Sequence, residues 1–176
     1  MLRLMLFRHA KSDWPRDVDD RDRPLSERGR KAAPQMGRFM AEAGLVPGLV
    51  LVSPARRTRE TWERASETMG DDLPAMREDS RLYLAPFGLL LKVIGETPPS
   101  VPSLMLVGHQ PGLQELAIRL VGSGGIEDRT ALGAHFPTAA LAVIDFEQEA
   151  WPDILPASGR LERFVTPKLL GASVDD

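Results

Sequence analysis

The sequence LRLMLFRHAKS, residues 2–12, changes abruptly from apolar to polar after Phe7. Its apolar part is long enough for a buried strand and too short for a helix, so we expect a strand at residues 2–7. Two later stretches repeat the pattern, LVLVSPARRT at residues 49–58 and LMLVGHQPG at residues 104–112. Each apolar run is followed by polar residues and then by helix signals, and this repeated order decides the fold class.

Helices are expected after these strands. Ser26 can cap a helix that runs toward Gly44, and Pro34 either bends that helix or marks its start. Ser53 can cap a second helix, from about residue 54 to residue 70. The other expected elements are a short strand near Met76, helices at residues 86–95 and 113–121, and strands at residues 139–146 and 161–165.

Strands that alternate with helices predict a three-layer α/β/α fold with a mostly parallel central sheet covered on both faces. The last two strands are joined only by a polar loop that contains prolines. Such a connection favours an antiparallel pair, so one antiparallel edge strand is expected.

Composition limits the class of protein. A chain of 176 residues with 43% apolar and 27% charged residues predicts one globular domain, spanning residues 1–176. The chain has no cysteine, which excludes disulfides, a thiol nucleophile and thiolate metal sites. No apolar stretch approaches the roughly 18 residues of a membrane span, and the first apolar run is too short for a signal peptide. A cytoplasmic protein without a membrane partner is therefore expected.

Charge is distributed unevenly along the chain. Residues 1–64 hold 14 Lys and Arg against 9 Asp and Glu, whereas residues 65–176 hold 8 against 16. An anionic ligand is therefore expected to bind in the first third. Residues 17–23 mix both signs of charge, which argues against a nucleic-acid partner.

Two histidines and several arginines follow the predicted strands, at the edge of the sheet where ligands bind in such folds. Arg8 and His9 follow the first strand, Arg57 the second and His109 the third. A lone histidine at a strand end is more often structural, and His135 is assigned to that class. Together, however, imidazole can attack phosphorus while guanidinium groups clamp phosphoryl oxygens. Two histidines without a third ligand give no support for zinc, so neither a metal nor a cofactor is expected.

Seven segments, in order over nearly the whole chain, add a further signal: LFRHAKS at 6–12, DRPLSERG at 22–29, SPARRTRET at 53–61, LYLA at 82–85, VGHQP at 107–111, FPTA at 136–139 and FVTP at 164–167. With these segments the chain resembles the histidine phosphatase superfamily, also called phosphoglycerate mutase-like. Within it, the chain is most similar to the SixA-type phosphohistidine phosphatases. The resemblance implies the phosphoglycerate mutase-like fold.

The resemblance also implies roles for individual residues. His9 would be the nucleophile that accepts the phosphoryl group, with Arg8 and Arg57 binding the phosphoryl oxygens. His109 would complete the pocket and, in the hypothesised reaction cycle, would hold a phosphoryl oxygen in its protonated form. The family pattern Ser-Pro-x-x-Arg selects Arg57 over Arg56.

Two further residues, Ser12 and Arg23, would line the entrance to the pocket and contact the substrate.

One departure concerns the leaving group. Many members of the superfamily carry a carboxylic acid after the third strand region, but the matching stretch here, RLYLAP at residues 81–86, has none. The SixA-type members resemble the chain in this respect. General acid assistance contributes about 10²–10⁴-fold, so poor activity on alkyl phosphates is expected. Glu78, Asp79 and Asp13 are the only nearby acids.

The resulting prediction is a metal-independent phosphatase that forms a phosphohistidine intermediate and acts on a phosphohistidine-bearing protein. Two alternatives stay open at this stage. One is a phosphatase of a small phosphorylated metabolite, and the other is a module that binds phosphate without catalysis. The short segment between Thr61 and Leu104 leaves little material for a lid, which favours an open pocket that admits a protein side chain.

Overall fold

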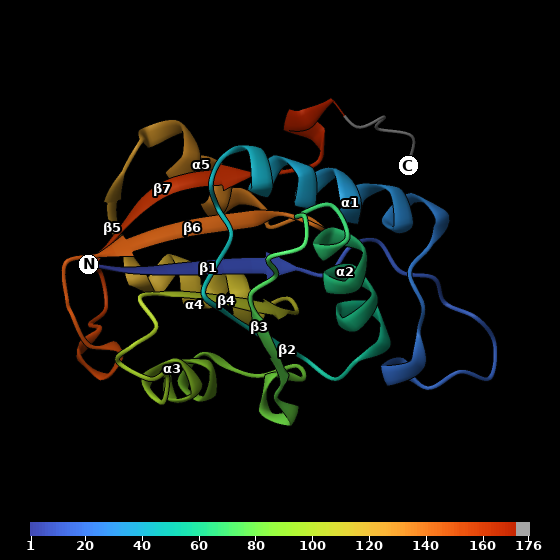
Figure 1. Cartoon of the computed structure of the whole chain (residues 1–176), viewed down its shortest axis with the longest axis horizontal. Coiled ribbons are helices and arrows are strands. Elements are labelled where there is room, and N and C mark those ends of the chain that lie inside the picture. Colours follow the sequence, from blue (N-terminus) through green and yellow to red (C-terminus); the bar gives the residue numbers. More distant parts are fainter. Residues whose placement is uncertain (172–176) are drawn as a thin grey trace.

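The structure, a computed structural model, describes residues 1–171. Its strands are β1 (Leu2–Arg8), β2 (Leu49–Val52), β3 (Ala75–Glu78), β4 (Ser103–Gly108), β5 (Val121–Gly124), β6 (Leu141–Phe146) and β7 (Gly159–Val165). Its α-helices are α1 (Glu27–Glu42), α2 (Arg56–Ser66), α3 (Phe87–Gly95), α4 (Gly112–Leu120) and α5 (Ile126–Ala134). Short 3-10 turns include η1 (Asp20–Asp22) and η2 (Ser80–Leu82). All the strands join one sheet in the order β3-β2-β4-β1-β6-β7-β5 (Figure 1).

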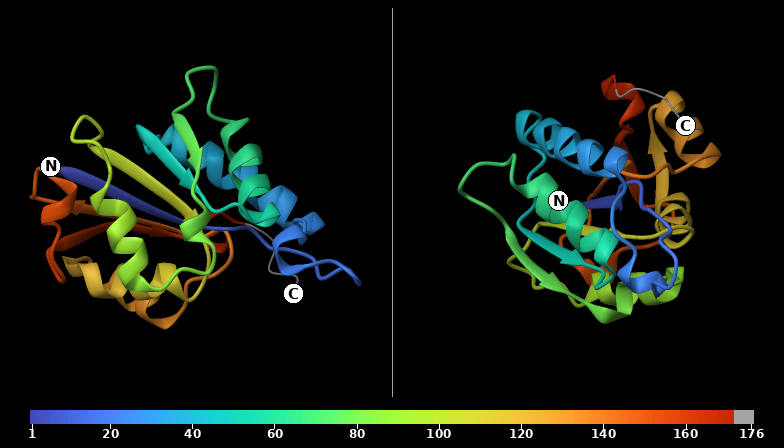
Figure 2. Two further views of the ribbon diagram at one scale, coloured as in Figure 1. Left: turned by 90° about the horizontal axis from the view of Figure 1, so that it is seen from below. Right: turned by 90° about the vertical axis from the view of Figure 1, so that its right-hand side faces the viewer.

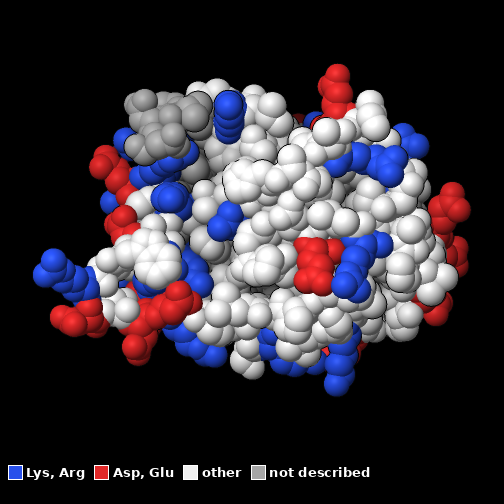
Figure 3. All heavy atoms as spheres, turned by 180° about the vertical axis from the view of Figure 1, so that it is seen from behind, with Lys and Arg blue, Asp and Glu red and all other residues white. Residues whose placement is uncertain are grey.

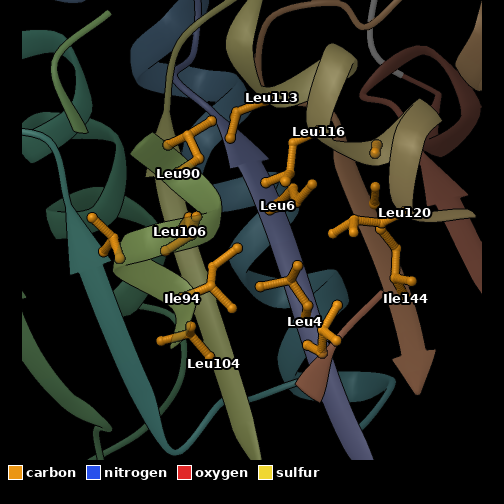
Figure 4. Packing of buried hydrophobic residues seen from close by; sticks show 14 of the residues in the cluster. Leu4, Leu6, Leu90, Ile94, Leu104, Leu106, Leu113, Leu116, Leu120 and Ile144 are labelled. Atoms are coloured by element: carbon orange, nitrogen blue, oxygen red, sulfur yellow. The ribbon is translucent and has the colours of Figure 1, made fainter. Parts of the chain in front are cut away.

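Helices cover both faces of this sheet. In Figure 2, α1 and α2 lie on one face, and α3, α4 and α5 lie on the other. The strands contribute alternate side chains to the two layers. Met5 and Phe7 of β1 pack in the cluster beneath α1 and α2, whereas Leu4 and Leu6 pack beneath α3 and α4 (Figure 4). Burial on both faces explains why β1 is an almost unbroken apolar run, and the predicted three layers are confirmed.

The sheet is mostly parallel, as predicted. Strands β3, β2, β4 and β1 run parallel, and β6 runs antiparallel to both β1 and β7. The predicted antiparallel pair of late strands is therefore confirmed as β6 and β7. A strand that the sequence did not reveal, β5, pairs with the outer side of β7, so β6 lies inside the sheet. Strand β5 is rich in glycine, and a Cβ at Gly122 would lie 1.9 Å from the Ala157 carbonyl oxygen, so packing and not an apolar pattern determines this edge.

The helix starts confirm one expected cap and correct another. Ser26 caps α1 by accepting a hydrogen bond from the Gly29 backbone nitrogen at 3.1 Å, and Pro34 lies within a continuous helix. Helix α2 begins at Arg56, and its N-cap residue is Ala55. Ser53 is therefore not the cap, and its hydroxyl has a different partner.

Candidate active site

Strand register brings the two histidines together. Arg8 of β1 pairs with Gly108 of the parallel neighbour β4, so the residues that follow them, His9 and His109, leave the sheet side by side. The His9 backbone nitrogen donates to the Gly108 carbonyl oxygen at 3.1 Å, and the two imidazole ring centres are 5.5 Å apart. The observed geometry confirms that the carboxyl ends of these strands gather the histidines.

The ring of His9 is held in one tautomer. Its Nδ1 lies 2.7 Å from the carbonyl oxygen of Ala10. A carbonyl oxygen only accepts hydrogen bonds, so in the neutral ring Nδ1 carries the proton and Nε2 keeps its lone pair. The side chain is also buried, at 7% exposure. His9 therefore has the form that nucleophilic attack through Nε2 requires.

His109 contacts Ser53, the residue that the sequence suggested as a helix cap. Its Nε2 lies 2.7 Å from the hydroxyl oxygen of Ser53, the residue that follows β2. The ring of Tyr83 stands edge-on to His109, with ring centres 5.5 Å apart. Because the Ser53 hydroxyl can donate to Nε2, Nδ1 of His109 can carry a proton toward a ligand.

Both predicted arginines belong to this site and keep unused donors. Nη1 of Arg8 donates to the Phe136 carbonyl oxygen at 2.9 Å. Nη1 and Nη2 of Arg57 donate to the carbonyl oxygen and the carboxylate of Asp20, at 2.6 and 3.0 Å. Within residues 1–171, five buried side-chain polar atoms lack a hydrogen-bond partner, and three of them are Nε of Arg8, Nε of Arg57 and Nδ1 of His109. Buried donors without partners are rare in folded proteins, and three in one site indicate a missing acceptor.

Asp20 is a site residue that the sequence did not single out. Its carboxylate accepts hydrogen bonds from Arg57, from Arg23 at 3.0 Å and from the hydroxyl of Tyr83. Burial alone would raise the pKa of the Asp20 carboxyl, but these hydrogen bonds outweigh burial and hold the pKa well below its usual range. The mixed-charge tract at residues 17–23 concealed this role, because nothing local distinguishes Asp20 from its acidic neighbours.

Thr61 links helix α2, which carries Arg57, to the loop that begins at His9. Its hydroxyl oxygen accepts from the Ala10 backbone nitrogen at 2.9 Å and donates to the Arg57 carbonyl oxygen at 2.6 Å. Both bonds are buried, where hydrogen bonds are most costly to lose. One hydroxyl group therefore links the backbone of the His9 loop to the first turn of α2.

Ser12 and Arg23 lie beside Asp20, and they bond to each other. Nη2 of Arg23 donates to the Ser12 hydroxyl at 2.6 Å, Nε donates to the Asp13 carbonyl oxygen at 3.1 Å, and the guanidinium stacks 3.2 Å from the ring centre of Trp14. Both residues are buried. These contacts brace the loop that holds Asp20, and a direct contact with substrate stays a prediction.

The two imidazoles are neutral in the free protein. Burial lowers the pKa of His9 to about 3; the hydrogen bond to Ala10 opposes this effect, and the nearby charges of Arg8 and Arg57 add to it. Burial also lowers the pKa of His109 to about 3, assisted by Arg57 and opposed by Asp20. In the free site, two neighbouring guanidinium groups and little water make the charged ring unfavourable, and a protonated His109 beside a bound phosphoryl group stays a prediction.

These pKa values predict how stability depends on pH. An unfolded histidine has a pKa near 6.5, so between about pH 6.5 and 3 the unfolded chain binds more protons than the folded chain. The contribution of the two histidines to stability is fully present above pH 6.5 and is lost as the pH falls toward 3. We expect the free energy of unfolding to fall by about 2 kcal/mol for each histidine as the pH is lowered from 7 to 4.5. Urea unfolding across this range should show a shallower pH slope for His109→Gln than for the wild type, and equal slopes would contradict the assignment.

The remaining sequence predictions concern residues outside the site. His135 is exposed at the end of α5 and follows no strand. No cluster of three or more metal-binding side chains was found in the described part of the chain, residues 1–171. In the same part, no helix has the length and apolar character to cross a membrane.

Comparison with known proteins identifies the family. Residues 4–85 match the model of the histidine phosphatase superfamily (branch 1). An uncharacterised protein of Mycobacterium tuberculosis is 34% identical over 92% of this chain and 100% of its own length. A putative phosphohistidine phosphatase SixA from Agrobacterium tumefaciens is 30% identical, with a TM-score of 0.77 over 94% of this chain and 98% of that one. The chain belongs to the histidine phosphatase superfamily.

A second solved structure supports the SixA-like placement within the histidine phosphatase superfamily. A putative phosphohistidine phosphatase SixA from Nakamurella multipartita superposes with a TM-score of 0.81, covering 94% of this chain and 96% of that one at 26% identity. The protein is thus a SixA-like member of the histidine phosphatase superfamily and a phosphatase.

Proposed function

We propose that this phosphatase hydrolyses phosphohistidine on proteins, through a phosphoryl group carried transiently by His9. The observation that carries the proposal is the set of three buried polar atoms without partners, on Arg8, Arg57 and His109, beside a neutral His9. A bound phosphoryl group supplies acceptor oxygens for all three. Two guanidinium groups also neutralise the charge that a metal ion neutralises in other phosphatases, so the proposed mechanism needs no metal.

In the first step, Nε2 of His9 attacks phosphorus in line with the leaving group. The Nε2–P bond forms while the P–N bond of the substrate phosphohistidine breaks, and the released imidazole takes a proton from solvent. Nδ1 of His9 keeps its proton throughout and donates a hydrogen bond to the Ala10 carbonyl oxygen, 2.7 Å away. The low pKa of His9 keeps Nε2 unprotonated at neutral pH.

In the second step, water hydrolyses the phosphorylated His9. The oxygen of water bonds to phosphorus, the Nε2–P bond breaks, and inorganic phosphate leaves with the neutral ring restored. Arg8 and Arg57 hold the equatorial oxygens in both steps, since charge moves across them in each transition state. A phosphoryl dianion beside His109 favours the protonated ring, so the charge on that residue follows ligand binding.

The ionised carboxylates near the site favour a substrate whose leaving group departs without a proton from the enzyme. Asp20 is held ionised by its hydrogen bonds, so it has no proton to donate at neutral pH. Asp79, one of the predicted substitutes, is paired with Arg81 at 2.8 Å, and that pairing lowers its pKa. Alkoxides leave slowly without a proton donor, whereas an imidazole leaves as a neutral ring.

Substrate comparison tests this proposal. We expect kcat/KM for a histidine-phosphorylated protein to exceed that for phosphoserine and sugar phosphates by about 10²–10⁴-fold, the size of the missing general acid contribution. Aryl phosphates should fall between the two classes, because their leaving groups need less protonation. Steady-state kinetics with this panel gives the ranking. Preference for one sugar or nucleotide phosphate would overturn the proposal in favour of a metabolite phosphatase.

A further inference from the structure

A groove of about 1380 Å³ opens beside the histidine site. One wall is the start of α1, and the other consists of the end of α5, residues 137–138 and the segment that follows β7. The groove is far larger than a phosphoryl group, and His9 and His109 do not line it. It is therefore a second feature of the same edge of the molecule, separate from the histidine site.

The walls of the groove are attached to the histidine site through the backbone. Lys11 lines the groove and lies two residues after His9. On the opposite wall, Pro137 and Thr138 lie between two backbone contacts of the site. These contacts are the Phe136 carbonyl oxygen, which accepts from Arg8 at 2.9 Å, and the Ala139 nitrogen, which donates to the His9 carbonyl oxygen at 3.0 Å. The groove therefore lies within reach of a polypeptide that presents a phosphorylated side chain to His9.

The groove is cationic on a chain of net charge −3. It is lined by five basic side chains and by two acidic ones, Asp13 and Glu27; the basic residues are Lys11, Arg28, Arg30, Lys31 and Lys168. All five basic residues are exposed. Within residues 1–171, Lys31 pairs with Glu27 at 3.4 Å, whereas Lys11, Arg28 and Lys168 form no ion pair. Figure 3 shows Lys and Arg side chains on its left, the side on which α1 begins, with Asp and Glu side chains among them.

We propose that this groove binds an acidic segment of the phosphorylated protein substrate, next to the phosphohistidine. The inference rests on the proposed function, since it names the part of the substrate that the groove receives. Opposite charge accelerates encounter and fixes orientation, and its effect falls as salt screens the groove. The groove would thereby select among proteins that all carry the same phosphorylated side chain.

The lining favours a polypeptide over a nucleic acid. Asp13 and Glu27 interrupt the basic surface and would repel a continuous phosphate backbone. Phe164, the one aromatic side chain of the lining besides the imidazole of His135, is 3% exposed and offers no face on which bases could stack. Small apolar residues such as Ala32 and Ala131 leave room for the side chains of a peptide.

Two phosphohistidine peptides, identical except for four flanking Glu in one and four Gln in the other, test the proposal. We expect wild-type kcat/KM to be about tenfold higher for the Glu peptide at low salt, through a lower KM. The double variant Arg28→Glu with Lys168→Glu should abolish this preference, and 0.5 M salt should weaken it in the wild type. The matched control, Arg38→Glu with Arg77→Glu, reverses two exposed charges outside the groove and should retain the preference.

N-Phosphoimidazole, which has the reacting bond and no peptide, separates docking from chemistry. Its hydrolysis should be equal in the wild type and both double variants, which also shows that the variants fold. Equal wild-type kcat/KM for the two peptides would overturn the proposed role of the groove and leave the proposed function intact. If no phosphohistidine compound is hydrolysed, the proposed function fails. Binding of the unphosphorylated Glu peptide then decides the groove: loss in Arg28→Glu with Lys168→Glu supports it, and unchanged or absent binding overturns it.

Discussion

Replacement of His9 by Ala is expected to reduce turnover of phosphohistidine by 10⁴-fold or more, on the order of losses seen when a covalent nucleophile is removed. The remaining groups still bind a phosphoryl group, but no lone pair is left in line with phosphorus. The wild type, incubated with a phosphodonor and quenched, should carry one phosphoryl group that is labile to acid and stable to alkali. His9→Ala should carry none. Intact-mass analysis with a radiolabelled donor measures both.

Two variants control this result. His135→Ala changes an exposed histidine that lines the groove and not the phosphoryl pocket, so it should leave the adduct and the hydrolysis of N-phosphoimidazole unchanged. His109→Ala removes one donor of the pocket, so it should slow turnover and still permit an adduct on His9. An adduct of undiminished yield in His9→Ala would show that another residue accepts the phosphoryl group.

Replacement of Arg57 by Ala is expected to lower kcat/KM by about 10²–10³-fold, the usual loss when a preorganised donor to a transition state is removed. The guanidinium is almost fully buried, at 3% side-chain exposure, and Asp20 orients it through two bonds. Arg57→Lys should recover little of the loss, because a single ammonium lacks the planar fork that binds two oxygens. Steady-state kinetics on a phosphohistidine peptide gives the ratio.

The preceding residue provides the matched control. Arg56 lies one position away on α2, but its side chain is half exposed and pairs with Glu60. Arg56→Ala should change kcat/KM by less than about twofold, as is usual for an exposed ion pair. A larger loss from Arg56→Ala than from Arg57→Ala would mean that the family pattern was placed one residue out of register.

Strands β1, β2 and β4 and the meeting of the two histidines at their ends could be predicted because each signal is local. An apolar run predicts a strand, and the next residues reach the edge where ligands bind, so His9 and His109 could be assigned before their distance was known. Ser53 illustrates the limit of local reasoning. A serine before proline is typical of a helix start, but only the register of β2 against β4 places its hydroxyl against His109.

What the sequence did not reveal depends on contacts between distant segments. Asp20 meets Arg57 across 37 positions, and Tyr83 meets Asp20 across 63. Neither side chain stands in a pattern that distinguishes it from its neighbours. The low pKa of His109 has the same origin, since burial and the charge of Arg57 arise only when the chain is folded. The region of β5 and α5 has little apolar periodicity, because β5 is an edge strand and one α5 residue, Leu132, is buried.

The residue-for-residue pairing of β1, β4 and β2 has a consequence for how this site can diverge. His9, His109 and Ser53 each stand one position beyond a paired residue, so backbone hydrogen bonds of the sheet alone determine their spacing. Loops can lengthen or exchange sequence without altering that spacing. A single inserted residue within one of these strands turns every following side chain to the opposite face. New specificities can therefore arise in the connecting segments while the reacting groups keep their places.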